Sequence, residues 1–193
     1  MKKYIAEALG TFTLAFVVGL SITGLFPVST PILAALVLGL FVYSIGHISG
    51  AHINPAVTIG AWSIGKISRR DAIGYIVFQL IGAFIAGLLL ASFGHTPVLA
   101  VSGSLMTGFA EMLGTFFFTF GIASVIYGKT PSVMSGFVVG GSLLLGITIS
   151  ALLGANGVLN PAVAFGIGSF GFMYILGPII GSVLGMRVYE KLQ

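Results

Sequence analysis

Apolar residues fill two long stretches of this chain without interruption by charge. Residues 8–65 contain no Asp, Glu, Lys or Arg, and neither do residues 130–186. A helix that crosses a lipid bilayer needs about 20 apolar residues. Each stretch is too long for two such helices and slightly short for three. Two membrane spans and one half-length helix therefore fit each stretch best.

Turn residues divide the chain into six spans and two shorter apolar segments. The predicted spans cover residues 5–26, 31–48, 71–92, 106–127, 132–152 and 172–190. The apolar segments left over are residues 54–64 and 160–170, and each begins with Asn-Pro. These two segments are too short to cross a membrane, so we expect them to enter it and return as re-entrant half-helices.

Composition places the chain in the membrane. Hydrophobic residues make up 57% and charged residues only 6%, whereas soluble proteins carry about 25% charged residues. This excludes a soluble enzyme, a DNA-binding module and a disordered linker. The net charge of +4 comes from eight Lys and Arg against four Asp and Glu, which are too few to form a nucleic-acid-binding face. The absence of cysteine excludes disulfides and thiolate metal sites.

The positive charges orient the predicted spans. With six spans and two re-entrant segments, all eight Lys and Arg residues fall on one side of the membrane. Positive residues are enriched on the cytoplasmic side of membrane proteins. We therefore predict an integral protein of the plasma membrane with both termini in the cytoplasm. Glu7 within the first apolar run argues against a cleaved signal peptide.

The second half of the chain resembles the first. Residues 6–12 read like residues 110–116, and Asn54-Pro55-Ala56-Val57 recurs as Asn160-Pro161-Ala162-Val163. Residues 1–193 are thus predicted as one channel domain with repeats of about 1–100 and 101–193. Because each repeat has three spans, the second starts on the opposite side of the membrane. Sites in such inverted repeats lie near the midplane, where the halves meet.

The two Asn-Pro-Ala motifs predict a pore. Asn54 and Asn160 suit the cap position of a helix, and the following proline suits its first turn. Each Asn side chain then keeps its NH₂ group as a donor. Two such donors and two positive helix ends at the midplane favour neutral hydrogen-bonding solutes and repel cations. A motif that merely starts a helix is the alternative, but its repetition at equivalent places in charge-free stretches favours the pore.

Glu7 and Glu111 are the carboxylates that lie well inside spans, at equivalent positions of the repeat. Such a group has either a functional role, in proton relay or ion binding, or a structural one. No Lys or Arg lies deep enough to pair with them. Backbone amides of the re-entrant loops are the available donors, so anchoring of the loops is favoured.

Nothing in the sequence predicts an enzyme, a metal site or a cofactor. His47 and His52 lie five residues apart without a carboxylate, which makes a poor metal site. We interpret them as hydrogen-bonding residues of the first loop, with His52 close to the pore. Gly46-His47-Ile48-Ser49-Gly50 lacks the Gly-x-Ser-x-Gly spacing of a serine hydrolase.

The chain resembles the aquaporin, or major intrinsic protein, family over essentially its whole length. The resemblance rests most on residues 46–58, which contain the first Asn-Pro-Ala motif, and on the second copy of that motif. Further similarities lie in the first, third and sixth spans, at residues 7–12, Tyr75, Gln79, Gly82, Ala83, Gly177, Pro178 and Gly181.

This resemblance implies an all-α membrane protein with six tilted helices in a right-handed bundle and two half-helices. It further implies a homotetramer with one pore per subunit, through which water and small neutral solutes pass. Glu7 and Glu111 would anchor the two loops. A ladder of backbone carbonyls would line the pore, contributed by Gly50, Ala51, His52 and Ile53 and by Gly157, Val158 and Leu159.

The sequence departs from the family at the outer constriction of the pore. Most members carry Arg three residues after the second motif Asn, where this chain has Val163. By ungapped spacing, the other narrowing positions are Ala34, Thr148 and Gly157. These residues predict a wide constriction without positive charge, permeable to water and to glycerol, urea or ammonia. An ion-coupled transporter that uses Glu7 or Glu111, or a non-conducting structural membrane protein, are the alternatives.

Overall fold

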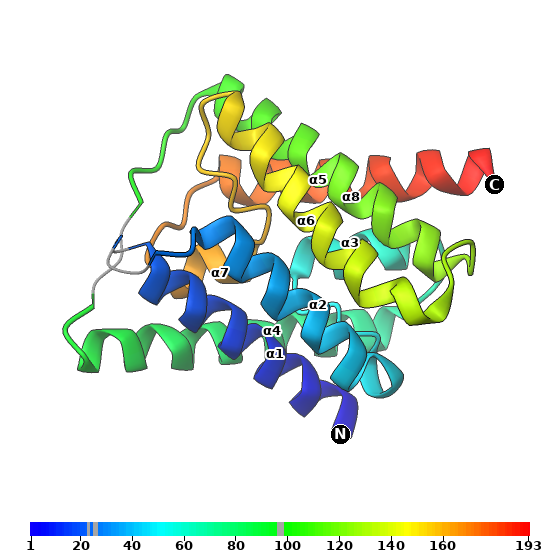
Figure 1. Cartoon of the computed structure of the whole chain (residues 1–193), viewed down its shortest axis with the longest axis horizontal. Coiled ribbons are helices and arrows are strands. Elements are labelled where there is room, and N and C mark those ends of the chain that lie inside the picture. The colour runs from blue at the N-terminus through cyan, green and yellow to red at the C-terminus, as the bar shows by residue number, and fades with distance from the viewer. Residues whose placement is uncertain (23, 25–26, 96–98) are drawn as a thin grey trace.

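The computed structural model describes residues 1–22, 24, 27–95 and 99–193, and every regular element in these ranges is a helix. In Figure 1 the colour follows the chain from blue to red, and both termini lie toward the same end of the bundle. The elements are α1 (Lys2–Ser21), α2 (Thr30–Ser49), α3 (Pro55–Ser63), α4 (Arg69–Ser92), α5 (Leu105–Ile126), the 3₁₀ turn η1 (Ser132–Met134), α6 (Ser135–Leu152), α7 (Pro161–Gly166) and α8 (Met173–Leu192).

In the described part of the chain, six helices have 18 residues or more, which is long enough to cross a bilayer. By length and composition, α1, α2, α4, α5 and the segment Ser132–Leu152 are clear candidates. The sixth, α8, has 20 residues but carries Arg187, Glu190 and Lys191 near its end. The order of long and short helices agrees with the predicted order. The predicted end of the first span, residues 25–26, lies outside the described residues, and α1 itself ends at Ser21.

The two half-helices are as short as expected. α3 has nine residues and α7 has six, and at a rise of about 1.5 Å per residue neither reaches across a membrane core of about 30 Å. α7 ends four residues before the predicted boundary of residue 170. Gly168 takes a positive φ of 70° there, and the amide of Ser169 bonds back to the carbonyl of Ala164. This left-handed turn stops the helix.

Equivalent helices make equivalent contacts in the two halves. α1 packs on α2 and α4, just as α5 packs on α6 and α8. α2 and α6 join the halves directly. Each half-helix crosses over: α3 packs on α8, and α7 packs on α4. The half-helices are therefore held in the interior by the last span of the opposite half, as Figure 1 illustrates.

Glycines allow the long helices to approach closely. A Cβ atom added at Gly82 of α4 would overlap the carbonyl oxygen of Ala8 on α1. At the equivalent crossing, a Cβ atom at Gly181 of α8 would overlap the carbonyl oxygen of Met112 on α5. In both cases the obstacle is backbone, which has no rotamer with which to avoid the clash. Small residues are common where membrane helices cross at short distance.

Replacing Gly82 with Ala is expected to destabilise the protein by about 3 kcal/mol, because α1 and α4 must separate to admit the methyl group. Thermal unfolding in detergent, followed by circular dichroism, measures this loss. Gly141 on α6 is the matched control, since a Cβ atom there meets nothing within 4 Å. Equal unfolding temperatures for G82A and G141A would contradict the close α1–α4 crossing.

Candidate functional site

Glu7 holds the first re-entrant loop from inside the bundle. Its side chain is fully buried. Oε1 accepts hydrogen bonds from the Ser49 hydroxyl at 2.7 Å and the His52 amide at 3.0 Å. Oε2 accepts from the Ile53 amide at 2.6 Å and the Gln79 side-chain amide at 2.8 Å. A carboxylate offers about four acceptor positions, and each oxygen here uses two.

Glu111 repeats this arrangement in the second half. It is fully buried, and its Oε2 accepts the Leu159 amide at 2.8 Å. Its Oε1 accepts the Val158 amide at 3.0 Å and the Ser150 hydroxyl at 3.3 Å. Both carboxylates thus face donors of the loops, and this geometry favours anchoring over proton relay.

The loop backbones adopt left-handed conformations that turn the amides toward the two carboxylates. Positive φ angles occur at Ala51 (50°), Ile53 (38°), Gly157 (67°) and Leu159 (54°). Three of these residues have a side chain, and the left-handed conformation of each one destabilises the fold by about 1–2 kcal/mol. The bonds to Glu7 and Glu111 offset that strain. The carbonyls of Gly50, Ala51, His52, Gly157 and Val158 accept no hydrogen bond from the described protein.

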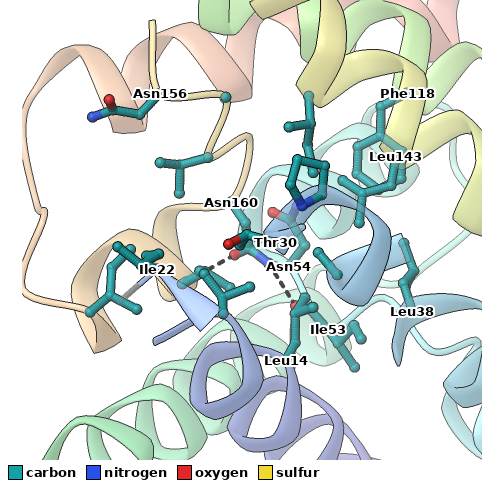
Figure 2. Close-up of a pocket in the computed structure, with 18 of the residues that line it drawn as sticks. Leu14, Ile22, Thr30, Leu38, Ile53, Asn54, Phe118, Leu143, Asn156 and Asn160 are labelled. Atoms are coloured by element: carbon teal, nitrogen blue, oxygen red, sulfur yellow. Dashed lines mark hydrogen bonds between the residues drawn. The ribbon is translucent and has the colours of Figure 1, made fainter. Parts of the chain in front are cut away.

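The two motif asparagines join the loops to each other at the centre of the bundle (Figure 2). Asn54 caps α3, since its Oδ1 accepts the Ala56 amide at 2.8 Å, and its Nδ2 donates to the Leu159 carbonyl at 2.9 Å. Asn160 caps α7 in the same way, and its Nδ2 donates to the Ile53 carbonyl at 3.0 Å. The sequence predicted that each NH₂ group is left free to point outward as a donor. One of its two hydrogens is in fact bonded, and the other remains available.

Two cavities lie one after the other along the bundle, and the first of them reaches this junction. One, of about 270 Å³, extends from the junction toward the α1–α2 connection and is lined by Asn54, Asn160 and Thr30. The other, of about 640 Å³, extends toward the opposite end and is lined by Lys3, Lys66 and Asp71. We call them the outer and the inner cavity. His52 and Leu38 line both, so the cavities follow one another through the bundle.

Three of the four predicted constriction residues line the outer cavity: Ala34, Gly157 and Val163. Thr148 does not, and this prediction needs correction. Its side chain is exposed on α6, and its hydroxyl donates to the Leu144 carbonyl at 2.8 Å. The neighbouring Ile147 lines the cavity instead. A Cβ atom at Gly157 would lie 3.1 Å from Cγ2 of Ile147, so the two residues face each other.

Three supporting residues were not assigned a role from the sequence. The Tyr75 hydroxyl donates to the Ser49 carbonyl at 2.7 Å. Gln79 donates to Glu7 and, at 3.0 Å, to the Thr58 hydroxyl, which lies 3.2 Å from Nδ1 of His52. Gln79 is the one amide side chain of the apolar helix α4. A single amide side chain in an apolar helix was the signal in the sequence that Gln79 is buried and bonded to another polar group.

Charge is distributed unequally between the two cavities. No Asp, Glu, Lys or Arg is among the residues that line the outer cavity in the described part of the chain. At the inner cavity, Nζ of Lys3 lies 2.8 Å from Oδ1 of Asp71. Nζ of Lys66 lies 4.2 Å from the centre of the Tyr127 ring, in cation–π contact. Among the described residues that line the two cavities, charged side chains are therefore found at the inner cavity and not at the outer one.

Comparison with known proteins identifies the family. The sequence model described as major intrinsic protein matches residues 1–189. The chain is 34% identical over 207 residues to glycerol uptake facilitator protein-like 6 of Lactiplantibacillus plantarum, covering 95% of this chain and 94% of that one. It is 32% identical over 177 residues to aquaporin AqpM of Methanothermobacter thermautotrophicus, covering 78% of this chain and 71% of that one.

The fold agrees with a solved structure. The X-ray structure of the aquaglyceroporin from Plasmodium falciparum superposes with a TM-score of 0.72, covering 99% of this chain and 94% of that one, at 24% sequence identity. The chain therefore belongs to the major intrinsic protein family, and it is a passive membrane channel, not an enzyme, for water and small solutes.

Proposed function

We propose that this channel passes larger neutral solutes, such as glycerol, urea or ammonia, as well as water. The outer cavity carries the proposal, because Ala34, Gly157 and Val163 add little bulk to its wall and no charge. An Arg at position 163 would add bulk, a fork of donors and a positive charge. Relatives named as a glycerol uptake facilitator and an aquaporin agree with a channel of this breadth.

Permeation through the junction uses the two asparagines as donors and the loop carbonyls as acceptors. A solute that enters the outer cavity exchanges bonds to water for bonds to the carbonyls of Gly157 and Val158. At the midplane it accepts the remaining hydrogens of Asn54 and Asn160. The donors there point at the solute, as do the positive ends of the half-helices, so a cation meets an unfavourable potential.

We also propose that the chain works as a homotetramer in the plasma membrane, with one pore per subunit and inverted repeats at residues 1–100 and 101–193. Both termini lie at the end of the bundle where Lys3 and Lys66 line the inner cavity. Because positive residues are enriched on the cytoplasmic side of membranes, this supports a cytoplasmic location for that end. Large apolar side chains such as Leu9, Leu36 and Leu40 are exposed on α1 and α2, as expected for contact with lipid or with another subunit.

Liposomes that contain the channel should shrink quickly after any osmotic shock and should reswell quickly only when the solute used for the shock can cross the channel. Stopped-flow light scattering on proteoliposomes is expected to show fast shrinkage under an impermeant sugar, and fast reswelling when the shock is made with glycerol or urea. Fast shrinkage without reswelling under either solute would contradict the wide constriction. Shrinkage no faster than in empty liposomes, with folded protein, would favour the transporter or the structural alternative.

A further inference from the structure

We infer that Lys66 keeps small cations out of the inner cavity, and that the ring of Tyr127 holds the Lys66 side chain in place for this task. The structure assigns Lys66 a role in specificity and Tyr127 a positioning role. The inference rests on the proposed function, because the cations it concerns have the size of the neutral solutes proposed for the same pore. It follows from the charges around the inner cavity.

The inner cavity carries one charge without a partner. Lys3, Lys66 and Asp71 are the Lys, Arg, Asp or Glu residues among the described residues that line it. Lys3 and Asp71 form an ion pair at 2.8 Å, so their charges largely cancel at a distance. In the described part of the chain, no carboxylate oxygen lies within 4 Å of Nζ of Lys66. Its ammonium group therefore sets a positive potential in this cavity.

Tyr127 fixes the position of this ammonium group. Nζ of Lys66 lies 4.2 Å from the centre of the Tyr127 ring. The ring is itself held twice, because its hydroxyl donates to Oε1 of Glu190 at 3.0 Å and it stacks on Tyr189 with the ring centres 6.0 Å apart. Oε2 of Glu190 lies 3.9 Å from Arg187, which balances its charge. A flexible lysine side chain is thus kept beside the cavity by cation–π contact.

A fixed charge beside a cavity separates ions from neutral molecules of the same shape. Charge in a cleft with low-dielectric walls changes the local concentration of ions by about tenfold or more. The outer cavity offers no such barrier, since no Asp, Glu, Lys or Arg is among the described residues that line it. Urea and guanidinium form a suitable pair of probes, because both are small and planar and guanidinium alone is charged.

Uptake of labelled guanidinium into proteoliposomes, beside stopped-flow reswelling in urea, tests the role of Lys66. Potassium chloride on both sides with valinomycin holds the membrane potential at zero. At low salt, Lys66→Glu is expected to raise guanidinium uptake about fivefold or more, and Lys66→Gln about twofold. Urea and water permeabilities should stay within about twofold of the wild type. In 1 M salt the Debye length falls to about 3 Å, and most of the difference should disappear.

Three further variants serve as controls. Lys191→Glu makes the same change at an exposed lysine of α8, at the end of the bundle where both termini lie, and Lys191 is not among the residues that line the inner cavity. K191E is expected to take up guanidinium as the wild type does. Tyr127→Leu removes the ring and should raise guanidinium uptake about twofold. Tyr127→Phe keeps the ring and should restore wild-type uptake.

The outcomes separate this inference from the function beneath it. Equal guanidinium uptake by K66E and K191E, or a difference that persists in 1 M salt, would overturn the inference while urea entry left the proposed function intact. Equal uptake by Y127L and Y127F would overturn the positioning role. Fast water flow without urea entry into wild-type liposomes would contradict the wide constriction, and the inference would fall with it. Should K66E lose water flow through misfolding, K66Q decides by the same comparison.

Discussion

Replacing Ala34 with Phe is expected to close the channel to urea and glycerol, with a fall of at least about tenfold in both permeabilities. Ala34 is 4% exposed and lines an outer cavity of only about 270 Å³. A phenyl ring at this position fills part of the cavity that Ala34 shares with Gly157 and Ile147, and a solute must cross that space. A barrier higher by 1.4 kcal/mol already gives a tenfold loss. Water, being smaller, should be slowed less.

The control for this experiment lies on α6. Thr148→Phe introduces the same ring at a position that simple spacing places in the constriction but that the structure places on the exposed surface. T148F is expected to conduct urea and glycerol as the wild type does. Stopped-flow reswelling compares the two variants. A block by T148F together with free passage through A34F would contradict the observed register of α6 and the assignment of the constriction.

Glu7→Gln is expected to destabilise the protein by about 3 kcal/mol or more. The new NH₂ group would face donors, because Glu7 now accepts from the amides of His52 and Ile53, from Ser49 and from Gln79. Leaving a buried donor unpaired costs about 1–3 kcal/mol, and loss of a charged acceptor costs more. Thermal unfolding in detergent reports the change. Fluorescence of Trp62, the single tryptophan, follows α3 directly.

Glu190→Gln provides the same chemical change outside the pore. Glu190 lies near the end of α8. Its Oε1 accepts a hydrogen bond from the Tyr127 hydroxyl at 3.0 Å, and its Oε2 lies 3.9 Å from Nη1 of Arg187. Partly exposed pairs of this kind contribute about 0–1 kcal/mol, so E190Q should unfold close to the wild-type temperature. If E7Q were as stable as E190Q and yet failed to conduct, the carboxylate would act in permeation, and loop anchoring would not explain its burial.

Much of the fold follows from patterns that are local in the sequence. Charge-free stretches, Pro and Gly at their ends and the repeated Asn-Pro motif were enough to predict six spans and two half-helices. Asn54 and Asn160 cap their helices as expected, because capping depends on a residue and its next three neighbours. The length of α7 was overestimated. Its end depends on a left-handed turn at Gly168, which composition alone does not distinguish from a glycine within the helix.

Two kinds of feature were harder to predict from the sequence. One is the rotation of a helix about its axis, and the other is a contact between residues that are far apart in the chain. Counting residues placed Thr148 in the constriction, but successive residues of a helix differ by about 100° around the axis. The loop between α6 and Asn160 contains left-handed glycines at Gly154 and Gly157, so an ungapped count from the motif across it cannot fix which face of α6 is inward. The contact of Gln79 with Glu7 spans 72 residues of sequence. Burial of both groups indicates partners, yet only the packed helices identify which ones.

The paired bonds between the two motif asparagines and the opposite loops bear on how the channel is made. The Ile53 carbonyl receives its donor from Asn160, 107 residues later in the chain. Leu159 in turn relies on Asn54, 105 residues earlier. During biosynthesis neither bond can form until the second half has been made. The centre of the pore can therefore be completed only after Asn160 has been made, and a single repeat could complete it only by pairing with an oppositely inserted copy of itself.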